Sequence, residues 1–231
     1  MSEPVVKESD ELKDSVWTLL QYLAQRLFHI ENYYLIYSEL GLHYNKAVNA
    51  DSAKAYLEII NSHKGFFLPV QEALRATFTV ELCSFVVKKE RKYKSIGKAI
   101  DDLKTLPNAP DLNAEYNALL RKHTKVIDHI EKFRNQFYAH KSFADLLKLP
   151  SSSDKEFQDL FAELKELLNK THAYFGNTVW FMEDSARESL KDTHDMMNNL
   201  LRGEAQRLSE IEVEFISGVY EDGRRKWMTN D

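Results

Sequence analysis

The chain has 231 residues, a net charge of −5 and 43% hydrophobic side chains. This length is enough to bury a sizeable core in one large domain or two small ones. The single cysteine, Cys83, excludes an internal disulfide framework and any zinc site built from several cysteines. The acidic balance argues against a bulk polyanion binder, so any contact with nucleic acid would have to be local.

The composition predicts an all-α protein. The chain has only seven glycines and five prolines, whereas Leu, Ala, Lys and Glu are plentiful, as in proteins with long helices and short connections. No charged-then-apolar signal peptide opens the sequence, and no run approaches the roughly 18 consecutive apolar residues of a membrane span. We therefore expect one helical domain over residues 1–231, soluble, cytoplasmic and without contact to a membrane, with a core at about 10–182 and a C-terminal helical extension at about 184–231.

The first half of the chain begins with a long amphipathic pattern. Apolar residues recur every three or four positions from about Ser9, which predicts a helix that ends near Gly41. Asp51 is expected to cap a shorter helix, and Pro69 to open the next one, because proline is tolerated in a first turn. The apolar stripe of that third helix consists of Val70, Leu74, Phe78, Leu82 and Val86.

The third helix runs into the densest basic run of the chain. One interpretation is a solvated helix end whose cations suit the negative C-terminal dipole. The other is a patch that follows RNA phosphates while Tyr93 stacks on a base. The cations concerned are Lys88, Lys89, Arg91, Lys92 and Lys94.

A short helix from Ser95 to about Lys104 and a loop at 107–110 precede the most strongly periodic helix, which Asp111 is expected to cap. Its stripe comprises Tyr116, Leu119, His123, Ile127, Ile130, Phe133 and Phe137. Because His123 falls inside the stripe, we expect a partly buried core histidine. His129 is predicted to be a surface residue without a partner.

The C-terminal third is also predicted to be helical. After a loop at 142–153, Ser153 and Glu156 form a capping box for a helix that bends near Gly176. Asp184 or Ser185 is expected to start another helix, which Gly203 closes. Beyond it, residues 204–231 fit both a strand and a helix, and we favour the helix. The other histidines show no paired spacing for a metal; they are His29, His43, His63, His172 and His194.

The last two turns of the periodic helix carry the most reactive set of side chains, Arg134-Asn135-Gln136-Phe137-Tyr138-Ala139-His140. On an ideal helix, Arg134 and His140 stand roughly 120° apart around the axis and about 9 Å apart along it. They are therefore not neighbours on one helix. His140 is either an ordinary core histidine, or part of a cleft that this helix forms with a second subunit.

These residue types suit phosphoryl chemistry. An imidazole titrates near neutrality and can move protons, whereas a guanidinium donates two hydrogen bonds to phosphoryl oxygens and keeps its charge. Asn135 could orient either group. The structural alternatives are an ion pair between Arg134 and Glu131 one turn earlier, simple exposure of Asn135, and core packing of Tyr138.

The order Arg, polar residue, four further residues, His resembles the signature of the HEPN proteins. The ending aromatic-Ala-His looks most like the branch found in bacterial abortive-infection proteins. The resemblance implies an up-and-down bundle of long antiparallel helices and a homodimer paired through the motif-bearing helices. It also implies a metal-independent endoribonuclease without cofactor, in which the RNA's own 2′-hydroxyl attacks the phosphorus.

The resemblance also implies roles for residues. Arg134 would stabilise the phosphate, His140 would handle protons and Asn135 would assist. Independently of the resemblance, the residue types suggest RNA contacts: Tyr138 could stack on a base, Lys141 would add positive charge beside His140, and the basic run of Lys88, Lys89, Arg91 and Lys92 could follow phosphates. The substrate would be tRNA or mRNA, cut in phage defence or by a toxin, with an antitoxin or defence-complex subunit as a further partner.

One position departs from a well-known HEPN subgroup. Toxins silenced by nucleotidylation of a tyrosine carry that tyrosine two residues after the histidine, where this chain has Ser142. Two alternatives to the nuclease stay open: a catalytically silent helical module that binds nucleotide or protein, and a scaffold subunit of a defence assembly.

Overall fold

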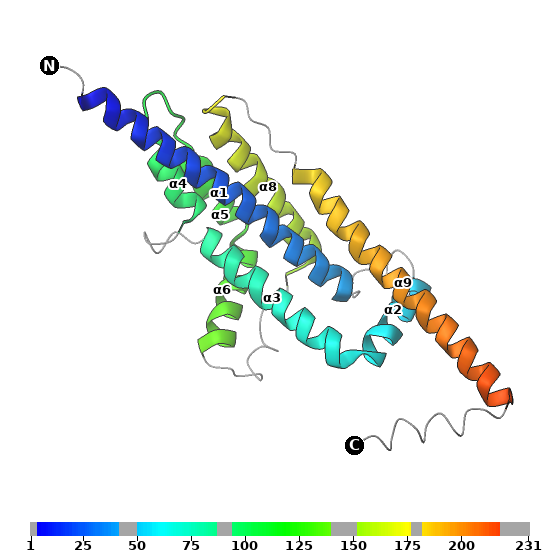
Figure 1. Cartoon of the computed structure of the whole chain (residues 1–231). Coiled ribbons are helices and arrows are strands. Elements are labelled where there is room, and N and C mark those ends of the chain that lie inside the picture. Colours follow the sequence, from blue (N-terminus) through cyan, green and yellow to red (C-terminus); the bar gives the residue numbers. More distant parts are fainter. Residues whose placement is uncertain (1–3, 42–49, 87–93, 140–151, 177–181, 218–231) are drawn as a thin grey trace.

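The computed structural model describes residues 4–41, 50–86, 94–139, 152–176 and 182–217 (Figure 1). These residues form eight helices and, within those ranges, no strand, which confirms the predicted all-α fold. The helices are α1 (Pro4–Gly41), α2 (Ala50–Ser62), α3 (Lys64–Val86), α4 (Ile96–Leu103), α5 (Asn113–Lys122), α6 (Thr124–Ala139), α8 (Asp154–Ala173) and α9 (Met182–Ser217).

Helix α1 is the central helix of the bundle, and α3 and α8 pack on it and run antiparallel to it (Figure 1). Near the start of α1, the Trp17 ring lies 5.3 Å from the ring of His172, close to the end of α8. Further along α1, Glu31 pairs with Lys165 at 2.9 Å, nearer the start of α8. The up-and-down arrangement of long helices is thereby confirmed.

The main hydrophobic core lies between α1, α3, α4, α5, α6 and α8. Leu20, Leu23 and Leu27 of α1 are fully buried in it, and burying each such side chain stabilises the fold by about 1.5–3 kcal/mol. A smaller cluster sits where α1, α2, α3 and α9 meet. It consists of Leu40, Tyr56, Ile59, Ile60, Phe67 and Met197.

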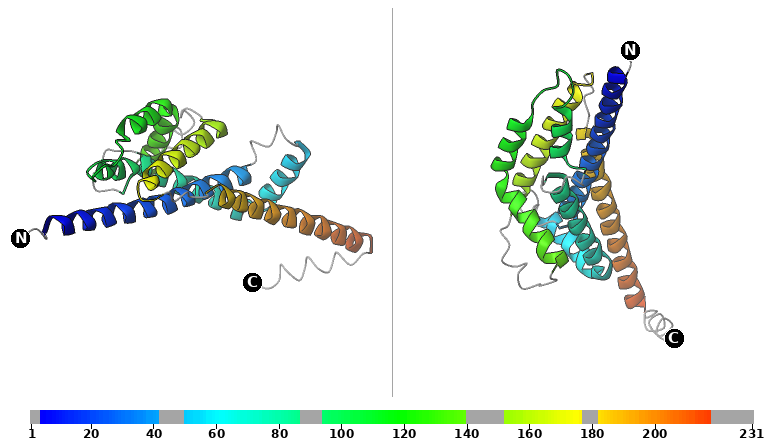
Figure 2. Two further views of the ribbon diagram at one scale, coloured as in Figure 1. Left: turned by 90° about the horizontal axis from the view of Figure 1, so that it is seen from above. Right: turned by 90° about the vertical axis from the view of Figure 1, so that its left-hand side faces the viewer.

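Helix α9 runs beside the last part of α1 and then continues beyond it (Figures 1 and 2). His194 Nδ1 lies 3.6 Å from Glu39 Oε1, close to the end of α1, so the later turns of α9 project past the bundle. The side chains of residues 202–210 are largely exposed, Leu208 among them. No helix in the described ranges combines the length and apolarity needed to cross a membrane.

Several predicted helix starts are wrong. Helix α1 begins at Pro4 rather than near Ser9, and α9 begins at Met182 rather than at Asp184 or Ser185. Helix α2 begins at Ala50, so that Asp51 lies inside it, and α3 begins at Lys64, so that Pro69 lies inside it. Proline at that position lacks the N–H that would bond to the Gly65 carbonyl, and its ring crowds that carbonyl. Burial of Phe67 in the smaller cluster stabilises the turn before the proline.

The expected single helix from Asp111 is in fact two helices, which meet at His123 with φ −100° and ψ 20°. The Thr124 hydroxyl donates to the carbonyl of Arg121 at 2.8 Å, a local bond that competes with regular helix. Asp111 is not the N-cap: Leu112 occupies that position, and Asp111 Oδ1 instead accepts the Asn113 N–H at 3.1 Å.

The predicted stop at Gly203 is also wrong, because α9 continues to Ser217. The Arg207–Glu204 ion pair, three residues apart, spans the turn after this glycine and supports the helix there. The preference for helix after residue 204 is confirmed as far as Ser217. The capping box of Ser153 and Glu156 is also confirmed.

Candidate functional site

Helix α6 packs on α3, on the side away from α1 (Figure 1). Val126, Ile130 and Phe133 are its buried residues. The guanidinium carbon of Arg75, from α3, lies 4.6 Å from the centroid of the Phe133 ring. This cation–π contact and the buried stripe fix the helix just before the motif begins.

Arg134 is half-buried and Asn135 is exposed at the first positions of the motif. Arg134 Nε and Nη2 donate to Asn135 Oδ1 at 3.2 and 3.1 Å. The ion pair considered with Glu131 does not form, and no carboxylate of a described residue pairs with Arg134. A guanidinium has five N–H donors, so Asn135 orients this one and leaves donors for a further acceptor.

The positive charge of Arg134 influences Cys83 in the C-terminal part of α3. Burial raises the pKa of the Cys83 thiol, the positive charge of Arg134 lowers it, and the negative charge of Glu131 raises it. Cys83 lies one turn before Val86, where α3 ends and the basic run follows in sequence. The motif therefore follows a contact with the middle of α3, where Arg75 meets Phe133, and the charge of Arg134 still acts on the later turns of α3.

Several predicted site residues lie outside the described residues. These are His140 and Lys141 of the motif region, and Lys88, Lys89, Arg91 and Lys92 of the basic run. Tyr138 belongs to α6, but its side chain is outside the description. Of the three predicted catalytic residues, the described part of the chain thus brings Arg134 and Asn135 together.

His129 is not the unpartnered surface residue that we expected. It is half-buried, and its Nδ1 lies 3.0 Å from the Ser152 hydroxyl, just before α8. Burial lowers the pKa of His129, and the nearby Arg75 lowers it further, against a smaller opposing effect of Glu156. The imidazole is therefore neutral near pH 7 and can accept a proton, which makes His129 a second candidate base on α6.

His123 is buried, as predicted from its place in the stripe. Its Nε2 lies 3.2 Å from Glu163 Oε2, an electrostatic contact between the α5–α6 junction and α8. Burial raises the pKa of Glu163, and contacts with Lys122 and His123 outweigh this effect, so that its pKa is lowered overall. His123 is accordingly a structural residue.

No cluster of three or more His, Cys, Asp or Glu side chains suited to a metal ion exists within the described ranges. Two cations close to the motif could meet a phosphate, Arg134 and, on α3, Arg75. Comparisons with protein-family models, curated proteins and solved structures find no match to this chain.

Proposed function

We propose that this chain is a metal-independent endoribonuclease of the HEPN type, acting as a homodimer in phage defence or as a toxin. The observation that carries the proposal is the state of Arg134. Its guanidinium is oriented by Asn135 and, among the described residues, neutralised by no carboxylate. A partly desolvated arginine of this kind is suited to two hydrogen bonds with a phosphodiester.

The reaction needs three things from the protein. A base removes the proton of the RNA 2′-hydroxyl, whose oxygen attacks the adjacent phosphorus. Negative charge on the phosphoryl oxygens is stabilised as the P–O5′ bond breaks, and the leaving 5′-oxygen gains a proton. His140 supplies the proton transfers and Arg134 the stabilisation of charge. The products are a 2′,3′-cyclic phosphate and a 5′-hydroxyl.

The helical geometry supports a site shared by two copies. Helix α6 is regular through Ala139, the residue before His140. An ideal helix would leave Arg134 and His140 on different faces, roughly 120° apart. Two motifs that face each other across a twofold axis can supply the imidazole of one copy and the guanidinium of the other.

The test compares wild type with His140→Ala and Arg134→Ala on a mixture of tRNA and mRNA in EDTA, with the product ends mapped. Each substitution is expected to lower the cleavage rate about 10²–10⁴-fold. Lys132→Ala is the matched control, since Lys132 is an exposed cation on the same helix. A substrate with a 2′-deoxy sugar at the cut position should resist cleavage.

Different outcomes have different meanings. Wild type that leaves RNA intact, or variants that cut as well as wild type, would overturn the nuclease and favour a silent binding module. A third variant, His129→Ala, locates the base. If it abolishes cleavage while its circular dichroism spectrum matches that of wild type, and His140→Ala still cuts, the proton transfers belong to the half-buried histidine, and the assignment of His140 is wrong.

A further inference from the structure

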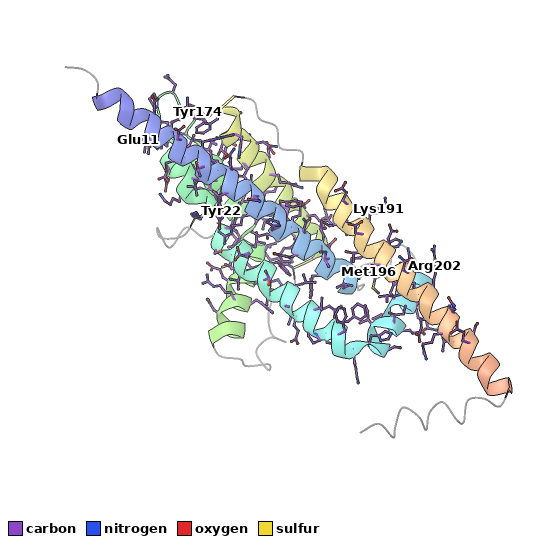
Figure 3. The ribbon with its side chains drawn as sticks, in the orientation of Figure 1. Glu11, Tyr22, Tyr174, Lys191, Met196 and Arg202 are labelled. Atoms are coloured by element: carbon purple, nitrogen blue, oxygen red, sulfur yellow. The ribbon has the colours of Figure 1, made fainter. Side chains whose placement is uncertain are left out.

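A groove of about 350 Å³ lies between α1 and α3 and contains no residue of α6. Its volume is at the lower end of the range for small-molecule sites. Figure 3 shows Tyr22 on α1, near the C-terminal end of α3. The lining residues are Tyr22, Gln25, Arg26, His29, Ile30 and Tyr33 from α1, and Thr77 and Glu81 from α3.

Aromatic rings form much of the groove wall. Tyr22 is 42% exposed, so much of its side chain reaches solvent. The rings of His29 and Tyr33 lie 6.5 Å apart and are inclined by 25°, close to parallel. Tyr22 is exposed, whereas Tyr33 is half-buried and packs against the main core. Ring surface that reaches solvent is the feature on which unpaired nucleobases stack in proteins that bind single-stranded RNA.

The polar groups of the groove are held in place. Arg26 Nε donates to Glu81 Oε2 at 2.7 Å, Arg26 Nη1 donates to the Lys94 carbonyl at 2.8 Å, and Arg26 Nη2 bonds to the Ser84 hydroxyl. Because the guanidinium of Arg26 is occupied by these partners, the polar group that the groove offers to a ligand is the carboxylate of Glu81, which Arg26 holds in place. A carboxylate accepts hydrogen bonds from the exocyclic amino group of a base.

A positively charged side chain that could meet the RNA backbone lies at the rim of the groove. The Lys94 ammonium is 4.4 Å from the centroid of the Tyr22 ring, and the residue itself is exposed. This ammonium covers one face of the ring, so a base would stack on the other face, with its phosphate close to the same positive charge. The ring face, the base edge and the phosphate of one nucleotide would each meet a suitable group.

The groove and the motif-bearing helix lie on two sides of α3. Glu81 faces the groove and bonds to Arg26 of α1, whereas Arg75, earlier on α3, contacts Phe133 of α6, the residue before Arg134. One helix, about 10–12 Å across with its side chains, separates the two sites. A single strand a few nucleotides long can cross that width.

We propose that this groove binds an unpaired base of single-stranded RNA, with Tyr22 and Tyr33 as stacking residues and Glu81 as acceptor for the base edge. The inference rests on the proposed function, since it gives the RNA a second point of contact away from the cleaved bond. The groove then selects which phosphodiester reaches Arg134.

The test uses the full chain carrying His140→Ala, so that RNA is bound without being cut. Binding of a fluorescent single-stranded RNA is measured by anisotropy for this protein and for the same protein with Tyr22→Leu or Tyr33→Leu. Each substitution is expected to raise Kd about 5- to 150-fold, the range for losing one stacked base. Phe66→Leu is the control, because Phe66 is an exposed aromatic residue at the other end of α3.

A second readout does not depend on the substituted proteins folding well. An RNA with 4-thiouridine is cross-linked to the His140→Ala protein by light, and the cross-linked peptide is identified. Attachment within residues 17–33 or 72–84 is expected. Unchanged affinity in both tyrosine variants, cross-links elsewhere, or no RNA binding would each overturn the groove as an RNA site.

Cleavage by the chain with His140 intact separates this inference from the function. If RNA occupies the groove but is never cut, the ribonuclease proposal fails and the groove stands. If RNA is cut, and Tyr22→Leu and Tyr33→Leu bind and cut it as wild type does, the proposal that the groove binds RNA is wrong and the ribonuclease proposal is retained.

Discussion

The two halves of α6 have different surroundings. In the first half, Val126 and Ile130 are buried, and His129 contacts Ser152 at the entrance to α8. In the second half, Arg134 is half-buried and Asn135 exposed, and among the described residues their side-chain hydrogen bonds join only each other. The contacts that hold the helix in the bundle therefore precede the motif.

This difference has a consequence for substitutions. A side chain in the first half contributes to the free energy of unfolding, so removing it confounds any loss of activity with a loss of folded protein. Beyond Phe133, the side chains of Arg134 and Asn135 bond only to each other among the described residues, so their removal is expected to have a smaller structural effect. Activity changes at Arg134 and Asn135 can thus be attributed to the site rather than to the fold.

The largest expected effect on stability is that of Ile130→Ala. Ile130 is 1% exposed, and truncating a buried isoleucine to alanine destabilises a protein by about 2–5 kcal/mol. Urea unfolding followed by circular dichroism measures this difference. An effect below about 1 kcal/mol would mean that the first half of α6 is not held by its buried stripe, and the contrast between the two halves would disappear.

The comparison can be extended to α3, whose last residue is anchored in the core. The Tyr116 hydroxyl donates to the carbonyl of Val86, and a Cβ on Gly97 would lie 3.0 Å from Cε1 of the Tyr116 ring. Gly97→Ala must displace this ring, and we expect a loss of about 1–3 kcal/mol in unfolding free energy.

Gly203→Ala is the matched control for this substitution. Gly203 lies inside α9, and a Cβ there would meet nothing within 4 Å. Alanine in a helix interior is favoured over glycine by about 0.5–1 kcal/mol, so stability should rise. Effects of the same sign at the two glycines would contradict the packing described around Tyr116.

Much of this architecture could be predicted from the sequence because the relevant signals are local. The apolar stripe of α3 can be recognised from apolar residues that recur every three to four positions. The capping box can be recognised from Ser153 and Glu156 alone. The break at His123 was missed, because a hydroxyl bond from Thr124 is compatible with both a straight and a broken helix. The continuation of α9 through Gly203 was missed because glycine weakens a helix without forbidding it.

The candidate site was predictable only in part. The partners of His129 depend on the approach of Ser152, 23 residues away, which the local pattern does not contain. Arg134 could pair with Glu131 or bond to Asn135, and two such local contacts differ by only a few tenths of a kcal/mol. Only the surroundings of the helix could decide between them.

A smaller effect, on pH dependence, is expected from His129 in the packed half. The fold lowers its pKa below the usual 6.5, mainly through burial, with Arg75 and Lys125 acting in the same direction and Glu156 opposing. The unfolded chain therefore binds more protons as pH falls through about 6.5. The stability contributed by the neutral imidazole is present above that pH and is lost below it.

Unfolding free energies between about pH 7.5 and 5 test this point, and His129→Gln should show a shallower decline than wild type. Burial also lowers the pKa of His172, so some decline should persist in the variant. The carboxyl of Glu156, with a pKa of about 2, stays ionised throughout this range. Identical slopes in the two proteins would show that His129 is not held neutral by the fold.

The smallest expected effect on stability is that of Asn135→Ala, in the motif half. Asn135 is exposed, so the unfolding free energy should change by no more than about 0.5 kcal/mol. The exposed Asn199 of α9, changed to Ala, is the matched control for both stability and cleavage. A destabilisation above about 1 kcal/mol by Asn135→Ala would mean that the motif is part of the packing after all.

Cleavage should respond more than stability does. Asn135→Ala removes the acceptor that orients Arg134, and we expect kcat to fall about tenfold with KM nearly unchanged, because a hydrogen bond to a charged group is worth about 1.5 kcal/mol at the lower end of its range. Asn135→Asp retains an acceptor for the guanidinium and should restore part of the rate. If neither variant alters cleavage while Arg134→Ala abolishes it, Arg134 acts without the support of Asn135. The orientation of its guanidinium must then come from the bound RNA or from the second copy of the chain.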